Sequence, residues 1–177
     1  LATALRTEGS AAPQWLSLNL LGERYWKVGL TELGMYSGVS GIALFLAEID
    51  QVNEQLSHAP ELGYQASALR VRRDEWLALT NELGERAARD GDEAGGAAFD
   101  YLMYAGYVAL GYFWARASLV ALKGLGRSAE GDRFYRSKLQ TARFYFERIL
   151  PRTESLASTI RAPAATLMEI ADDAFVF

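Results

Sequence analysis

The chain contains no cysteine and a single histidine, His58. Without thiols it can form no disulfide, no thiolate metal site and no cysteine nucleophile. His58 lies just before Pro60, at the expected end of a helix, and no serine or cysteine nucleophile motif accompanies it. We therefore expect a surface or capping role for this histidine rather than work as a catalytic base.

An excess of basic residues is also absent, since the net charge is −4 and the pI is near 5.1. Nucleic-acid binding depends on neutralising phosphates with Lys and Arg, so no nucleic-acid partner is expected. The start, LATALRTEGSAAP, has no basic residues followed by a continuous apolar stretch. We expect no secretory signal, a cytoplasmic location, and a chain cut from something longer.

No uncharged run reaches the roughly 20 residues that a membrane-spanning helix needs. The best candidate, Tyr101 to Ala115, is followed directly by Arg116 and carries its aromatic residues throughout rather than in belts at its two ends. Its length and spacing favour the core helix of a bundle, and we expect no membrane contact.

Two apolar helices are expected to form the centre of the fold. Residues 134–151 place apolar side chains at steps of three and four, with charged residues between them, and residues 98–122 form an aromatic helix. The short segment KGLGRSAEGD between them requires an antiparallel return. The stripes expected to face each other are Tyr135, Leu139, Ala142, Phe146 and Ile149 on the later helix, and Phe99, Leu102, Gly106, Leu110, Phe113, Ala117 and Val120 on the earlier one.

These two helices carry a resemblance to a known family. The runs GYVALGYFWAR and TARFYFERILP, within a match from about Trp76 to Phe177, resemble the C-terminal helical module of a branch of the FAD-dependent acyl-CoA dehydrogenases. In that family the flavin pocket, the acyl-CoA cleft and the carboxylate base lie upstream, and nothing resembling them is present here. The resemblance implies no catalytic, cofactor-binding or metal-binding residue in this chain, with FAD implied only for the full-length enzyme. It also implies self-association, or packing on a flavoenzyme core.

A second resemblance covers residues 14–48. The pattern WLSLNLL, a short hairpin and MYSGVSGIALFLAE are similar to the entry of the cyclase domain of class II lanthipeptide synthetases. That family binds zinc through two cysteines and a histidine, and this chain has no cysteine. Cyclisation by a zinc-activated thiol is therefore excluded here.

The predicted fold class is mainly α, an antiparallel bundle of three long helices over 64–162 preceded by a β-hairpin with strands near 15–20 and 24–28. Pro60 and Gly63 predict a boundary between units 1–60 and 61–177. Apolar residues at helical spacing predict two further long helices, the first with Ile42, Phe45, Ile49, Val52 and Leu56 and the second with Leu69, Trp76, Leu79, Leu83 and Ala87. After Pro151, Leu156 and Ile160 predict another helix, and the segment ATLMEIADDAFVF predicts a short terminal one.

Several polar groups resemble functional sites, but we expect the carboxylates to form a solvated face, the glycines to form a turn, and Ser40 not to be a nucleophile. The carboxylates lack the Glu-x-x-His pairs of di-metal bundles, the glycine-rich segment follows a helix and lacks a Gly-Lys-Ser/Thr ending, and Ser40 is not in a nucleophile elbow. Asp100 and Arg116 are expected to fix helix register, with Asp100 paired to Arg143 or Arg148. The carboxylates are Glu82, Glu85, Asp90, Asp92 and Glu93, and the glycines of the glycine-rich segment are Gly124, Gly126 and Gly131.

Four tyrosines on one helix allow either core packing with hydroxyls at the rim, which we expect, or a recognition site for a flat ligand or partner. They are Tyr101, Tyr104, Tyr107 and Tyr112.

For function we expect a non-catalytic helical accessory or oligomerisation module. The alternatives are a lanthipeptide cyclase fragment without its zinc ligands, and an artificial or chimeric bundle with no native activity.

Overall fold

The computed structural model describes residues 2–5, 14–21, 25–30, 39–170 and 174, with side chains described at 44–167, 169–170 and 174. Three strands come first: β1 (Ala2–Leu5), β2 (Gln14–Leu21) and β3 (Tyr25–Leu30). They pair antiparallel in the order β1-β2-β3, with Leu16 opposite Leu30 in the second pair. The β-hairpin expected over 15–20 and 24–28 stays a prediction, and the side chains of these strands lie outside the described part.

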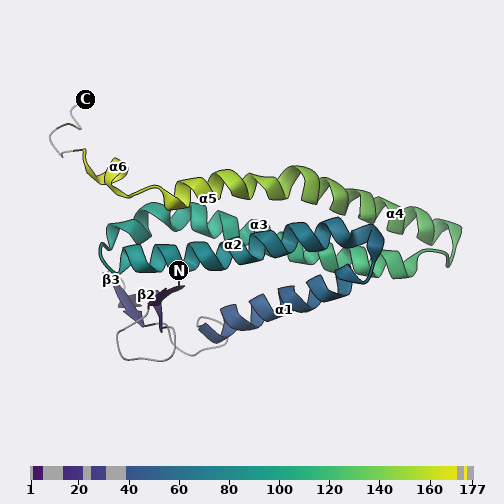
Figure 1. Cartoon of the computed structure of the whole chain (residues 1–177), viewed down its shortest axis with the longest axis horizontal. Helices are drawn as coiled ribbons and strands as arrows, with labels where there is room; N and C mark the ends of the chain where they lie inside the picture. The colour runs from purple at the N-terminus through teal and green to yellow at the C-terminus, as the bar shows by residue number, and fades with distance from the viewer. Residues whose placement is uncertain (1, 6–13, 22–24, 31–38, 171–173, 175–177) are drawn as a thin grey trace. The chain divides into compact units, whose positions relative to one another are not determined.

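Helices make up most of the rest, so the expectation of a mainly helical chain is confirmed (Figure 1). Glycine and proline set several of the boundaries: Pro60 opens a 3₁₀ turn and Gly124 ends the longest helix. The elements are α1 (Val39–Ser57), the 3₁₀ turn η1 (Pro60–Leu62), α2 (Gly63–Ala87), α3 (Asp92–Gly124), α4 (Ala129–Phe144), the π-helical turn η2 (Tyr145–Ile149), the 3₁₀ turn η3 (Leu150–Arg152), α5 (Thr153–Arg161) and α6 (Ala165–Met168).

The π-helical turn before Pro151 follows from proline chemistry. Proline has no N–H, and its ring clashes with the carbonyl four residues earlier, which here belongs to Glu147. The wider turn of η2 over Tyr145–Ile149 and the 3₁₀ turn of η3 let the chain pass this point without leaving the helical direction. The buried hydroxyl of Thr153 then donates to Leu150 O at 2.7 Å.

The chain divides into two compact units, and each is described by itself. The second unit contains residues 43–76 and 104–154. There α2 and α3 run antiparallel, because Tyr104 Oη donates to Arg72 O at 3.0 Å and a Cβ on Gly111 would lie 3.4 Å from Leu69 Cδ1. The larger buried side chains of this unit are Ile49, Val52, Leu56, Leu62, Leu69, Tyr104, Val108, Tyr112, Leu119, Tyr145, Phe146 and Leu150.

The first unit contains residues 1–42, 77–103 and 155–177. In it α2 and α3 are joined through the short link 88–91 and again run antiparallel, with Thr80 Oγ1 and Tyr101 Oη 2.7 Å apart in the core. Its buried apolar side chains include Leu79, Leu83, Ala97, Tyr101, Ala157 and Ile160. The expected division at residue 60 stays a prediction.

The buried face of α3 is the main correction to the sequence analysis. Phe99, Leu110 and Phe113 belong to the stripe expected to be buried, yet they are exposed. The core side of α3 instead carries Ala97, Tyr101, Tyr104, Val108, Tyr112, Ala115, Ser118 and Leu119. Apolar spacing could not choose between the two faces, because both faces of this helix are apolar and the tyrosine hydroxyls find polar partners inside.

Candidate functional site

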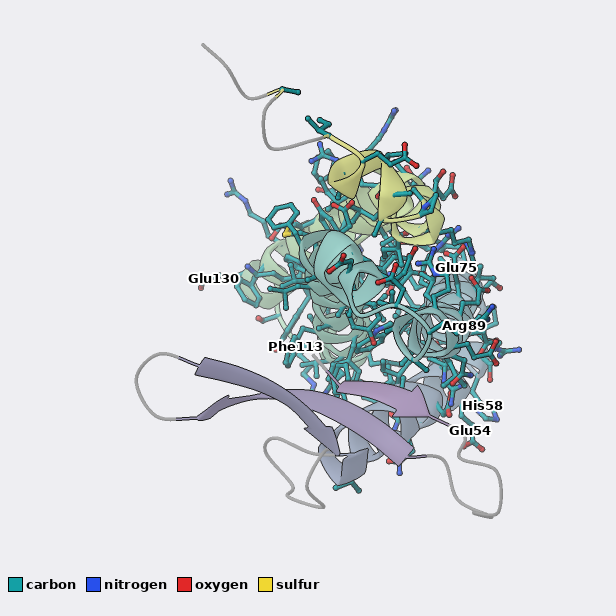
Figure 2. The ribbon with its side chains drawn as sticks, turned by 90° about the vertical axis from the view of Figure 1, so that its left-hand side faces the viewer. Glu54, His58, Glu75, Arg89, Phe113 and Glu130 are labelled. Carbon is teal, nitrogen blue, oxygen red and sulfur yellow. The ribbon has the colours of Figure 1, made fainter. Side chains whose placement is uncertain are left out.

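The most unusual surface of the chain is an apolar ridge along α3. We call it the α3 ridge and define it by Phe99, Leu102, Gly106, Leu110, Phe113, Ala117 and Val120. Its five large side chains have exposed fractions between 51% and 72%. Residues at steps of three and four lie on one face of a helix, so these side chains form one row along α3, with Phe113 labelled in Figure 2. Contiguous apolar surface of this kind marks an interaction site.

The opposite face of α3 is held in the core by hydrogen bonds of tyrosine hydroxyls. Tyr104 is fully buried, and its hydroxyl lies 2.8 Å from Glu75 Oε2. Glu75 in turn binds Arg72 Nη1 at 2.7 Å, and the other end of the Arg72 guanidinium donates to Glu154 at 2.9 Å. Burial, and then the hydrogen bond to the Glu75 carboxylate, raise the pKa of Tyr104 well above its usual range. The phenol is therefore a neutral donor that fixes which face of α3 points inward.

Two further tyrosines repeat this arrangement. Tyr145 Oη donates to Tyr107 O at 2.8 Å, and burial raises the pKa of Tyr145. Tyr112 Oη donates to Glu48 at 3.3 Å and accepts from Arg116 Nη1 at 3.1 Å. Core packing, which we expected for the four tyrosines of α3, is found for Tyr101, Tyr104 and Tyr112, whereas Tyr107 is half-buried.

The polar residues singled out from the sequence have structural partners. Arg116 is exposed and binds Tyr112, while Arg143, one of the partners expected for Asp100, pairs instead with Glu147 at 2.7 Å. His58 Nδ1 lies 2.8 Å from Glu54 O just beyond the end of α1, which matches a capping role (Figure 2). Ser40 lies in the first turn of α1, and its side chain is outside the described part.

The acidic residues are likewise used within the fold. Glu82 pairs with Arg161 at 2.8 Å, and Glu93 accepts from Ala164 N at 3.1 Å. Asp90 accepts from Asp92 N at 3.0 Å, while Glu85 is exposed. Within the part of the chain that the structure describes, no group of three or more His, Cys, Asp or Glu side chains is placed to bind a metal ion.

The glycine-rich segment 124–131 does not fit the phosphates of FAD, the cofactor that the resemblance implies for the full-length enzyme. Gly126 has a positive φ of 84°, and its N–H donates to Asp132 Oδ1 at 2.7 Å. Gly131 N donates to the N-cap Ser128 Oγ at 3.1 Å. These N–H groups bind side chains of the chain itself, and Asp132 would repel an anion, so the segment is a turn that starts α4.

A groove lies beside Gln65 in the second unit. It measures about 550 Å³ and has Leu62, Leu122 and Leu139 in its walls. Gln65 is fully buried; its Nε2 donates to Tyr64 Oη at 3.1 Å, and its Oε1 has no partner. Arg143, the basic residue among the described residues that line the groove, pairs with Glu147 at 2.7 Å.

Helix α3 is also long and apolar enough to cross a membrane by length and composition, although only 39% of its most apolar window is buried. Core helices of soluble proteins pass the same test, so this feature is weak grounds for a span.

Comparison with known proteins settles the family. Residues 45–171 match the family described as acetyl-CoA dehydrogenase C-terminal like, which is well over half of the chain. The chain belongs to this family. This acetyl-CoA dehydrogenase C-terminal-like domain therefore includes α2 to α6 and most of α1. No curated protein matches the chain. The likeness to lanthipeptide cyclases over 14–48 stays a prediction.

The sequence analysis missed the side chains that tie the helices together within each unit. Arg72 and Glu75 in the second unit and Arg86 in the first have partners 29 to 82 residues away. Their only local signal is the Arg-x-x-Glu step of 72 and 75, which also occurs on solvated helix faces.

Proposed function

We propose that this domain is a non-catalytic assembly module of an acyl-CoA dehydrogenase-type protein, and that the α3 ridge is its contact surface. The observation that carries the proposal is the exposure of Phe99 and Phe113, at 72% and 58%, on a helix whose other face is already packed. Isolated exposed apolar residues are common on protein surfaces, but a continuous row of them is typical of a protein contact.

The polar chemistry of the described residues supports a structural role. The perturbed phenols of Tyr104 and Tyr145 are neutral and buried, and the strongest charged network, from Glu75 through Arg72 to Glu154, ties helices together. A catalytic acid or base needs a pKa near the working pH and access to a substrate. The pKa of a buried tyrosine is raised, which takes it further from the working pH than the pKa of an ordinary tyrosine.

The test is the mass of the chain in solution, measured by light scattering over a range of concentrations. We expect self-association that weakens in Phe113→Asp, because a carboxylate in an apolar contact is desolvated without a partner. Phe144→Asp is the matched control, since Phe144 is also 57% exposed but lies on α4. A chain that remains monomeric at every concentration, with both variants alike, would contradict the proposal.

A further inference from the structure

Between residues 95 and 117, the face of α3 that carries the ridge reads the same in both directions from Gly106, whereas Val120 is matched by Asp92. Phe99 and Phe113 each lie seven residues from it, and Leu102 and Leu110 each lie four residues from it. Eleven residues away, the same face carries Gly95 on one side and Ala117 on the other, which are both small. The order small, Phe, Leu, Gly, Leu, Phe, small is thus unchanged when the helix direction is reversed.

We infer that the α3 ridge binds the α3 ridge of a second copy of this chain, antiparallel, with a two-fold axis passing close to Gly106. A two-fold contact brings residue i against residue j and residue j against residue i. In this pairing Phe99 meets Phe113 of the second copy, Leu102 meets Leu110, and Gly106 meets itself. The inference rests on the proposed function and names the partner and the register.

Glycine at the centre suits such a crossing. Gly106 is exposed, and a Cβ added to it would have nothing within 4 Å in its own chain, so no internal contact requires glycine there. Helix axes pack about 8–10 Å apart, and the shorter distances need small residues where the helices cross. Gly106 would let the two backbones approach, so that the phenylalanines on either side can interlock.

The exposed area is sufficient for a specific contact. An aromatic side chain presents about 150–250 Å², so Phe99 and Phe113, exposed to 72% and 58%, together offer about 250 Å². The aliphatic members of the ridge offer about as much again. Two copies would then bury about 1,000 Å², which is the lower bound for a specific interface. The positions from Gly95 to Ala117 on this face carry no charge, and Asp92, opposite Val120, lies at the edge of the contact, where it can remain in water.

The lack of cysteine makes the register directly testable by disulfide trapping. Gly106→Cys would place two thiols face to face across the axis, within the 4.4–6.8 Å between Cα atoms that a disulfide allows. The control is Arg136→Cys, an exposed position on α4 away from the ridge. At about 10 μM protein, an effective concentration near 1 mM in the dimer should make the ridge variant cross-link about 100-fold faster under mild oxidation.

A second pair of variants tests the direction of the helices. Leu102→Cys and Leu110→Cys lie eight residues apart, which is about 12 Å along the helix. In the antiparallel pairing each variant alone should cross-link slowly, whereas mixing the two should give the mixed disulfide. All these positions are exposed in the single chain, so the reduced variants should give the far-UV circular dichroism spectrum of the parent, which confirms that they fold.

The outcomes separate the register from the proposed function. Fast linking of Gly106→Cys together with a mixed 102–110 product supports the inference. Self-association by light scattering without a mixed 102–110 product, and with Gly106→Cys no faster than the control, overturns the register and leaves the assembly role standing. A monomeric parent chain with no preferential cross-link overturns both, and would direct attention to another partner for the ridge.

Discussion

The hydroxyl of Tyr104 is the single polar group on which the orientation of α3 depends most. It lies 2.8 Å from the Glu75 carboxylate inside the second unit, where the ring is fully buried. Removing it in Tyr104→Phe should lower the free energy of unfolding by about 1.5–3 kcal/mol, the usual value for a hydrogen bond to a charged group. Urea unfolding followed by circular dichroism measures this loss.

Tyr107→Phe is the matched control, because Tyr107 is on the same helix and its hydroxyl has no hydrogen bond in the described residues. We expect a change below about 0.5 kcal/mol there. Equal losses in the two variants would show that ring packing, and not the bond to Glu75, is what the substitution removes.

The raised pKa values of Tyr104 and Tyr145 predict a loss of stability in alkali. Both phenols are favoured in the neutral form by burial, so their folded pKa values exceed the ordinary value of about 10. Their contribution is fully present below pH 10 and is lost as the pH rises above the unfolded value, because unfolding then releases protons. Melting temperatures should fall above pH 10, and fall less steeply in the double variant Tyr104→Phe, Tyr145→Phe. Parallel curves for the two proteins would refute this assignment.

For single residues, the sequence can predict that a side chain has a structural role, but it predicts less well which atoms that side chain binds. His58 at a helix end and the glycine turn before α4 were predictable because their partners, Glu54 and Ser128, are within four residues. The partners of Tyr104 are 29 and 32 residues away, and no local pattern indicates them.

Among the helices, the C-terminal end of α5 depends on a side chain from α2. The last carbonyls of a helix have no partner within it. In the first unit Arg86 donates to the carbonyls of Ile160, Arg161 and Ala162 and pairs with Glu93 at 3.4 Å. One guanidinium therefore closes α5 and ties it to two other helices.

Replacing this group in Arg86→Met should lower the free energy of unfolding by about 2–3 kcal/mol, since several charge-assisted bonds are lost and Glu93 loses its ion-pair partner. Arg89→Met is the control, because Arg89 (labelled in Figure 2) is exposed in the link after α2 and its side chain donates to the nearby Glu85 O. Hydrogen exchange of the α5 amides should accelerate in the first variant alone. Unchanged protection of α5 would show that its end does not need the arginine.

The helix scale also shows where periodicity is insufficient. Over 134–151 charged residues mark the outer face, and Ala142 and Phe146 were correctly placed inside. Over 98–122 almost every residue is apolar, so spacing gives two candidates for the buried stripe, Phe99 to Val120 and Tyr101 to Leu119. The prediction that the first of them is buried is wrong. The polar partners of the tyrosine hydroxyls decide which stripe is buried, and these partners come close to the tyrosines only when the chain folds.

For the whole molecule, assembly through the α3 ridge predicts that stability depends on protein concentration. A partner that binds only the folded chain stabilises it by mass action, and for a dimer that partner is the chain itself. A tenfold rise in concentration should raise the melting temperature by about 1–3 °C for a protein of this size. Phe113→Asp should abolish the dependence, whereas Phe144→Asp should retain it, because Phe144 lies outside the ridge. Differential scanning calorimetry at three concentrations measures all three proteins. A melting temperature of the parent chain that is constant across them would mean that the ridge is not buried against another copy, and the exposed phenylalanines of α3 would then need a different partner.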